Sequence, residues 1–151
     1  MLKYLFVAVA VYGQSAWLVK DVPQAVPGNS NPLDAVQVGN AVYFTALSPT
    51  RSLYKYDTVT RRVSLVRQFN GVSNLLAINN KVVFTASGQD HWVTDGTAGG
   101  TTLLAAGTRF QPGGSAAKHS AVMGGYLYFG CFAAMAGNTY TLCKTDGTAA
   151  G

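Results

Sequence analysis

The 151-residue chain contains no glutamate and few charged residues of any kind. All six acidic residues are aspartates, and charged residues make up only 11% of the sequence. The lack of glutamate and the abundance of glycine, with 17 residues, disfavour long helices and favour short strands joined by turns. Beyond the N-terminus, no apolar run approaches the ~18 residues that a membrane-spanning helix needs. The composition therefore predicts an all-β protein with no membrane span after its N-terminal segment.

The N-terminal segment has the pattern of an export signal. A short positive start is followed by an apolar run at residues 4–12 and by a small, polar stretch at residues 13–16. We predict a signal peptide over residues 1–16, although Gln14 fits the −3 position poorly and cleavage after Gly13 is an alternative. A first buried strand or a retained anchor is the other interpretation. Export predicts a secreted, periplasmic or cell-surface protein, in which disulfides can form.

Three copies of one pattern follow the predicted signal peptide. Each copy has a turn flanked by apolar residues and then a strand that ends in aspartate: VGNAVYFTA (38–46) with LYKYD (53–57), INNKVVFTA (78–86) with HWVTD (91–95), and MGGYLYFGC (123–131) with LCKTD (142–146). Successive aspartates lie 38 and 51 residues apart, which brackets the period of about 40–50 residues in propeller-blade repeats. The repeat predicts a β-propeller-type region over residues 17–151, with three four-stranded blades at about 33–67, 73–105 and 118–151.

Turn chemistry separates the four strands of each copy. The pairs Gly39-Asn40, Asn79-Asn80 and Gly124-Gly125 tolerate positive φ, so each is expected to close a hairpin. In two copies the aspartate opens an Asp-Gly-Thr turn, in which the carboxylate accepts a backbone N–H two residues on and glycine supplies an angle that other residues resist. The residues predicted to form structural turns are Asp57, Asp95, Gly96, Thr97, Asp146, Gly147 and Thr148.

Four segments together resemble the bacterial ELWxxDGTxxGT repeat family: DGTAGGT (95–101), DGTAAG (146–151), HWVTDGT (91–97) and LVKDVPQAVPGNSNP (18–32). The resemblance covers residues 17–151 and implies a secreted or surface-associated β-propeller, in a family whose biochemical role is mostly undefined. The chain departs from the family pattern at the tryptophan position, which holds Tyr54 and Cys143 in two copies, and in the first copy, which reads DTVTRRV (57–63) instead of the Asp-Gly-Thr turn.

The two ends of the repeat region are complementary. The third copy stops where its fourth strand is expected, and residues 17–22 match a fourth strand with no blade before it. Propellers have about 4–8 blades, so three blades are too few for a self-closed ring. Two explanations remain open: the chain is a piece of a longer propeller, or residues 17–22 complete the third blade of another copy of the chain and two copies form a six-bladed ring.

The two cysteines fall on neighbouring strands of the third copy. Cys131 aligns with Ala46 of the first copy and Cys143 with Tyr54, so we predict that the cysteines face each other across one hairpin. Opposed residues have Cβ atoms about 4.5–5.5 Å apart, which a disulfide can span after a small adjustment. In an exported chain this pattern predicts a Cys131–Cys143 disulfide, with two buried thiols as the alternative.

No catalytic or metal-binding pattern is evident in the sequence. Nothing places Asp21, Asp34 or Asp90 together as a general acid and base. His91 and His119 adjoin apolar strands and are expected to be surface or partly buried side chains. The chain has no C-x-x-C, G-x-S-x-G, phosphate-loop or EF-hand pattern. We therefore predict no catalytic residue, cofactor or metal site.

Positive charge concentrates in the first copy. The formal net charge is +5, and the candidate ligand-binding residues are Arg51, Lys55, Arg61, Arg62 and Arg67. If Tyr54 and Tyr56 shared an exposed face with them, this region would bind an anionic polysaccharide, nucleic acid or cell-surface polymer. Strand alternation places Lys55 on the face opposite the two tyrosines, and an ordinary solvated strand surface is the other interpretation.

Three functions are compatible with these patterns. The first is a secreted or surface-associated, non-enzymatic propeller that binds or scaffolds through loops on one face. The second is a self-assembling or adhesive subunit that donates residues 17–22 as a strand to the next chain. The third is a piece of a glycan-active propeller enzyme with its site on other blades. The repeat, the predicted signal and the lack of a catalytic pattern favour the first.

Overall fold

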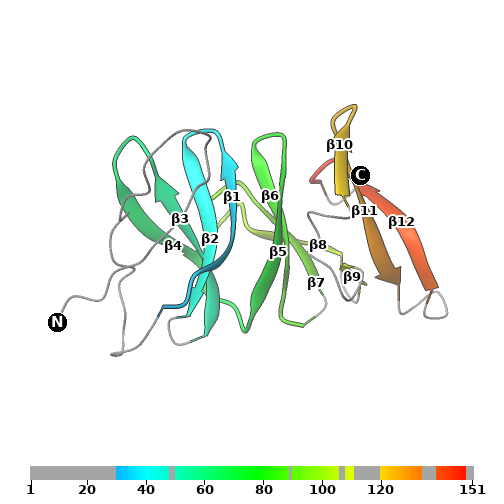
Figure 1. Cartoon of the computed structure of the whole chain (residues 1–151), viewed down its shortest axis with the longest axis horizontal. Helices are drawn as coiled ribbons and strands as arrows, with labels where there is room; N and C mark the ends of the chain where they lie inside the picture. The colour runs from blue at the N-terminus through cyan, green and yellow to red at the C-terminus, as the bar shows by residue number, and fades with distance from the viewer. Residues whose placement is uncertain are drawn as a thin grey trace.

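The chain folds into β-strands throughout the part that the computed structural model describes, which is residues 30–47, 50–88, 90–105, 108–110, 120–133 and 139–148. Twelve strands form three antiparallel sheets that follow one another along the chain (Figure 1), and none of these sheets closes on itself. The all-β prediction is confirmed. Within these same ranges, no helix has the length and apolar character needed to cross a membrane. The predicted signal peptide (1–16) and the predicted stray strand (17–22) lie outside the described residues.

The first sheet contains four consecutive strands in the order β1-β2-β3-β4. A two-residue turn joins its first two strands because Gly39 adopts a φ of +55° and leaves Val38 opposite Ala41. The strands are β1 (Leu33–Val38), β2 (Ala41–Leu47), β3 (Arg51–Asp57) and β4 (Arg62–Arg67).

The second sheet repeats this order as β5-β6-β7-β8. Asn79, with a φ of +51°, again allows a two-residue turn, here between Ile78 and Lys81. The strands are β5 (Val72–Ile78), β6 (Lys81–Ala86), β7 (Asp90–Thr94) and β8 (Thr102–Ala105).

The third sheet departs from the other two. Its central strand pairs with the last strand along one edge and with two separate short strands along the other, so the first strand of this sheet is split. The short strand at residues 108–110 was not predicted from the sequence. Among the described residues, none pairs with the outer edge of the last strand. The strands are β9 (Thr108–Phe110), β10 (Ser120–Met123), β11 (Tyr126–Ala133) and β12 (Thr139–Thr145).

Register shows that the three sheets are copies of one unit. In each sheet a phenylalanine on the second strand lies opposite the aligned residue of the third strand. The pairs are Phe44 with Tyr54, Phe84 with Trp92, and Phe129 with Cys143. The internal repeat of the sequence is therefore also a repeat of strand pairing.

The sheets pack face to face, and the second sheet lies between the other two (Figure 1). Alternation along β6 sends Val82, Phe84 and Ala86 into the core shared with the first sheet. Val83 points the other way, into the core shared with the third sheet, where it meets Leu127 and Phe129. Because both faces of the second sheet are covered, β6 reads as a nearly continuous apolar run.

Each sheet thus has a face toward the following sheet, which we call its forward face. On the second strand of each sheet, the forward face carries Tyr43, Val83 and Tyr128, respectively. The forward faces of the first and second sheets are covered by their neighbours.

Candidate functional site

The Asp-Gly-Thr turn of the second sheet is held by its own side chains. Asp95 Oδ1 accepts hydrogen bonds from the Thr97 backbone N–H at 2.9 Å and from the Thr97 hydroxyl at 2.8 Å. Gly96 has a φ of +92°, and its N–H donates to Thr94 Oγ1 at 2.9 Å. The two hydrogen bonds from Thr97 lower the pKa of the Asp95 carboxyl, so this carboxylate serves the turn.

The third sheet builds the same turn. Asp146 Oδ1 accepts the N–H of Thr148 at 2.8 Å and its hydroxyl at 2.6 Å, and these bonds lower the Asp146 pKa. The Gly147 N–H donates to Thr145 Oγ1 at 3.0 Å, and the φ of Gly147 is +81°. The turn geometry therefore repeats from the second sheet to the third.

The first sheet forms a different turn at the aligned position. Asp57 Oδ1 accepts the N–H groups of Val59 at 3.0 Å and Thr60 at 2.7 Å, and hydrogen bonding from Thr60 lowers the Asp57 pKa. Asp57 thus caps the turn between β3 and β4. Thr58 stands where the other two turns have Gly96 and Gly147, so a neighbouring side chain cannot approach the backbone of this turn as closely.

Each Asp-Gly-Thr turn contacts the forward face of the preceding sheet. From the first sheet, Tyr43 Oη donates to the Asp95 carbonyl at 3.2 Å and Lys55 Nζ to the Gly96 carbonyl at 3.3 Å. From the second sheet, Lys81 Nζ donates to the Gly147 carbonyl at 3.0 Å. An ammonium group on the carbonyl of the turn glycine therefore joins both pairs of neighbouring sheets.

Glycine is required at the first of these contacts for a steric reason. A Cβ on Gly96 would overlap the hydroxyl of Tyr43. Burial raises the Tyr43 pKa, and the nearby Asp95 carboxylate raises it further, so the Tyr43 hydroxyl keeps its proton and acts as a donor.

Three of the five predicted ligand-binding residues are held by backbone carbonyls. Arg51 Nη1 donates to Asn31 at 3.1 Å, and Arg67 Nη1 donates to Thr101 at 3.0 Å, while Lys55 binds the turn of the second sheet as described. Arg61 and Arg62 are both exposed; Arg61 lies in the turn between β3 and β4, and Arg62 is the first residue of β4. These basic residues therefore do not share a single environment.

The exposed tyrosine face that would have accompanied the basic residues is absent from the first sheet. Tyr54 is only 4% exposed because its ring packs against Phe44, with ring centroids 5.8 Å apart. Tyr56 is half-buried against the same cluster. The condition of a shared exposed face is therefore not met, because the two tyrosines face a buried cluster on this side of the sheet.

A pocket of about 350 Å³ lies where the first two sheets meet at their loop ends. The Arg67 guanidinium, one of its walls, lies 4.9 Å from the centroid of the Trp92 ring and 5.5 Å from that of Phe69. Such cation–π contacts orient the planar guanidinium. The lining residues are Thr50, Arg67, Gln68, Phe69, Asn70, Ser87 and Trp92.

Hydrogen bonds and a ring contact hold the aromatic wall of the pocket, Phe69 and Trp92, in place. Thr50 Oγ1 donates to the Phe69 carbonyl at 2.7 Å, and the Phe69 N–H donates to Ser52 Oγ at 3.3 Å. The Phe69 ring meets Trp92 edge to face, with centroids 5.2 Å apart. Trp92 Nε1 is buried and has no hydrogen-bond acceptor among the described residues. Of these lining residues, only Arg67 was a ligand-binding candidate from the sequence, since the others come from strand β7 and from separate loops with no common binding motif.

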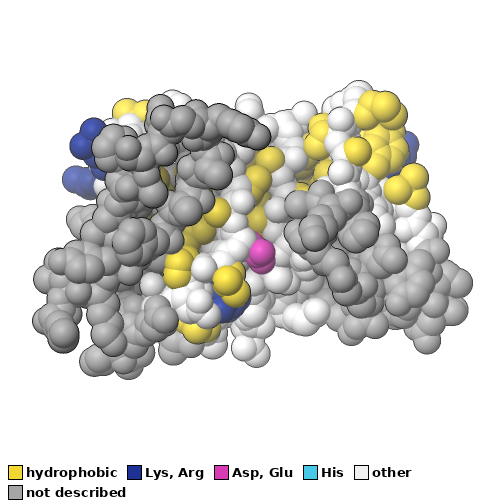
Figure 2. Space-filling model, in the orientation of Figure 1, with side chains coloured by type: hydrophobic (Ala, Val, Ile, Leu, Met, Phe, Trp, Pro, Cys, Tyr) yellow, Lys and Arg dark blue, Asp and Glu magenta, His cyan; other side chains and the backbone are white. Residues whose placement is uncertain are grey.

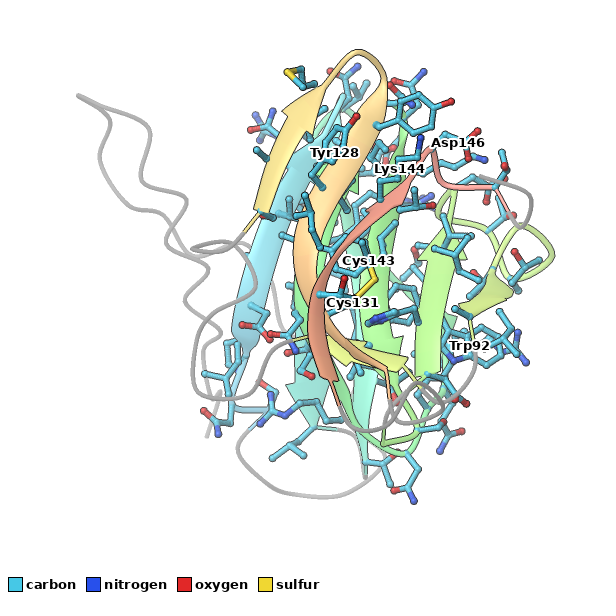
Figure 3. The ribbon with its side chains drawn as sticks, turned by 90° about the vertical axis from the view of Figure 1, so that its right-hand side faces the viewer. Trp92, Tyr128, Cys131, Cys143, Lys144 and Asp146 are labelled. Carbon is cyan, nitrogen blue, oxygen red and sulfur yellow. A yellow bond between two sulfur atoms is a disulfide. The ribbon has the colours of Figure 1, made fainter. Side chains whose placement is uncertain are left out.

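The cysteines of the third sheet form the predicted disulfide, Cys131–Cys143, with a Cα–Cα distance of 5.8 Å (Figure 3). The predicted direct opposition was wrong, because Cys131 lies opposite Thr141 and Cys143 lies opposite Phe129. The bridge therefore joins a diagonal pair, which strand twist can bring together on one side. A disulfide is compatible with an extracellular compartment.

The described acidic residues and His91 do not assemble a metal site, since no group of three or more potential ligands occurs in the described ranges. His91 is buried, and its ring meets Phe129 edge to face with centroids 5.4 Å apart. Burial lowers the His91 pKa to about 4, despite the opposing effect of Asp90. His91 is therefore neutral near pH 7. His119 and Asp21 lie outside the described residues.

No protein family, curated protein or solved structure matches this chain. The resemblance to the ELWxxDGTxxGT repeats stays a prediction from the sequence motifs. The function must therefore be inferred from the geometry of the sheets, the turns and the pocket.

Proposed function

We propose that the chain is a secreted or surface-associated, non-enzymatic repeat module of the β-propeller type, which scaffolds through its stacked sheets and binds an anionic polysaccharide at the Arg67 pocket. The observation that carries the binding role is the Arg67 guanidinium, which lies across two aromatic rings at a pocket of about 350 Å³. This volume falls in the range of small-ligand sites.

The chemistry of the pocket suits a carboxylate or sulfate group on a sugar chain. Among the described residues, Arg67 donates from Nη1 to the Thr101 carbonyl, and its other N–H groups can form a charge-assisted pair with an anion. Hydroxyl and amide groups on Thr50, Asn70 and Ser87 complete a polar rim for sugar hydroxyls. Because Arg67 lies over the Trp92 ring and Phe69 meets it edge-on, a stacked nucleic-acid base is a poorer fit than a sugar.

Blade-like stacking is supported by repetition at three levels. The sheets share one strand register, they pack face to face in chain order, and each Asp-Gly-Thr turn accepts a lysine from the sheet before it. This is how we expect blades of a propeller to follow one another. Strand donation by residues 17–22 has no support of this kind, since that segment lies outside the described residues.

Binding can be tested by titrating the full chain with polygalacturonate, a carboxylated polysaccharide, and with neutral dextran as the comparison. Arg67→Gln should weaken polygalacturonate binding at least about tenfold, since a charge-assisted hydrogen bond contributes about 1.5–3 kcal/mol. The matched control is Arg61→Gln with Arg62→Gln, which removes exposed charge elsewhere and should change binding by less than about threefold at physiological salt.

Three results would count against this function. Equal loss in the Arg67 and Arg61/Arg62 variants would mean that binding follows net charge, and equal binding of dextran would remove the role of the anion. New reducing ends in the same assay would favour the glycan-active enzyme instead. Thermal unfolding of each variant checks that Arg67→Gln keeps the fold, because Arg67 also packs on Trp92.

A further inference from the structure

The forward face of the third sheet is exposed, in contrast to the forward faces of the other two. Leu142 is 71% exposed and Met123 is 68% exposed, although both are large and apolar. Figure 2 shows hydrophobic side chains gathered over the end of the sheet where β10 turns into β11. Figure 3 looks onto this face, where Tyr128 and Lys144 are labelled. An exposed apolar surface of this kind commonly marks an interaction site.

This face carries the same pair of donors that joins the first sheet to the second. In the first sheet, Tyr43 lies directly opposite Lys55, and both bind the following Asp-Gly-Thr turn. In the third sheet, Tyr128 lies directly opposite Lys144 in the same register. The Lys144 ammonium lies 4.8 Å from the centroid of the Tyr126 ring, which leaves its N–H groups accessible from outside the sheet.

We propose that the forward face of the third sheet is a docking surface for a further sheet of this repeat type, which presents an Asp-Gly-Thr turn to Tyr128 and Lys144. The carbonyl of the turn aspartate accepts the Tyr128 hydroxyl, and the carbonyl of the turn glycine accepts the Lys144 ammonium. Apolar side chains of the docked sheet cover Leu142 and Met123. This inference rests on the proposed stacking of propeller-type sheets and names the partner that such stacking requires.

The turn of the partner must contain glycine. At the junction of the first and second sheets, a Cβ on Gly96 would overlap the Tyr43 hydroxyl, so only glycine brings the turn carbonyls within reach. The first sheet of a second copy has Thr58 at this position, and its turn therefore fits Tyr128 poorly. Lys81, which binds the Gly147 carbonyl at the second junction, shows that the lysine contact recurs in this fold.

The test appends a second copy of residues 101–151 directly after Gly151 of the full chain. The junction then reads Asp-Gly-Thr-Ala-Ala-Gly-Thr, which restores the spacing of residues 95–101 and offers the third sheet both a fourth strand and a following sheet. Lysine acetylation followed by mass spectrometry reports the exposure of Lys144. Lys55 and Lys81, which are held in the two existing junctions, serve as internal references for a docked lysine.

We expect Lys144 to react much faster than Lys55 and Lys81 in the original chain. In the extended chain its acetylation should slow at least about tenfold and approach the rate of the two references, as expected for a site that is closed most of the time. Gly147→Ala in the appended copy alone is the matched control, because it keeps the added sheet but blocks the approach of its turn to Tyr128. This control should restore most of the Lys144 reactivity.

Three results would overturn the inference. The first is a rate of Lys144 acetylation that the appended copy leaves unchanged. This includes the case in which circular dichroism shows the appended copy to be unfolded, because docking should stabilise it. The second is full protection that persists in the Gly147→Ala control. The third is concentration-dependent protection of Lys144 in the original chain, which would identify a second copy as the occupant. None of these involves the Arg67 pocket, so polysaccharide binding can fail or succeed independently.

Discussion

At the scale of single residues, the clearest constraint is the glycine of the Asp-Gly-Thr turn. Gly96 combines a φ of +92° with a position where a Cβ would overlap the Tyr43 hydroxyl. Gly96→Ala should therefore lower the free energy of unfolding by at least about 2 kcal/mol, from backbone strain and overpacking together. Urea denaturation followed by tryptophan fluorescence measures this loss.

Gly99 in the same loop provides the matched control for that substitution. A Cβ there meets no atom of the described residues within 4 Å, and the Gly99 backbone does not lie in the left-handed region. Gly99→Ala should change the stability by no more than about 0.5 kcal/mol. Equal losses at the two glycines would mean that the loop resists any substitution and that the contact with Tyr43 has no special role.

The buried His91 predicts that the stability depends on pH between about pH 4 and 6.5, a window above the one in which the aspartates titrate. The unfolded chain binds a proton at His91 below pH 6.5, whereas the folded chain does so only below about pH 4. The unfolded state therefore binds more protons between these values, and the free energy of unfolding falls as the pH falls through this window, by about 3 kcal/mol in total. Urea denaturation at several pH values from 7.5 to 4 measures the slope.

His91→Gln removes the titrating group and should flatten this slope. His119→Gln measures the contribution of the other histidine in the same way. The pKa values of three turn carboxylates, Asp57, Asp95 and Asp146, are lowered in the folded chain. Their contribution to the free energy of unfolding is therefore lost mainly below pH 3.8, the ordinary value, and does not mask the effect of His91. An unchanged slope in the His91 variant would show that this side chain is accessible to protons in the folded state.

At the scale of the strand and hairpin, the disulfide of the third sheet stabilises a unit that lacks a described fourth strand. Replacing both cysteines by alanine should cost about 2–3 kcal/mol, because the bridge closes a short loop of the unfolded chain. Alanine is the natural residue at the position of Cys131 in both other copies, so cavity formation there adds little.

Limited proteolysis of the double-alanine variant gives the readout. Cleavage should quicken within residues 120–148 while fragments from the first two sheets persist, and the dithiothreitol-reduced wild-type chain should behave in the same way. Uniform loss of all three sheets, or no change at all, would contradict a stabilising role confined to the third sheet.

Turns were predictable from the sequence at this scale, whereas register was not. Gly39, Asn79 and Gly124 indicate hairpins because the positive φ required at these turns restricts the residue type. Alignment of the repeats matched Cys131 with Ala46 correctly, but it could not say which residue lies across the strand, since that depends on pairing with β12. The pocket was equally hidden, because Arg67 meets Trp92 only after two sheets have packed together.

At the scale of the whole molecule, apolar packing between sheet faces and contacts to the Asp-Gly-Thr turns together join three similar sheets into a single stack. The sequence revealed the three copies and their all-β character, but not which face of each sheet is buried. That choice follows from alternation along the second strands and from lysines that reach the next turn. It also explains why Leu142, on the uncovered forward face of the third sheet, is open to solvent.

Nuclear Overhauser spectroscopy in solution, which detects proton contacts between sheets, is the most direct test of stacking through the Asp-Gly-Thr turns. Stacking through the turns predicts cross-peaks from the Tyr43 ring to the Gly96 α-protons, and from the Lys81 side chain to those of Gly147, because the side-chain atoms lie within van der Waals reach of each glycine. Strong contacts within each sheet without either cross-peak would contradict it, since the sheets would then form separately without stacking through their turns.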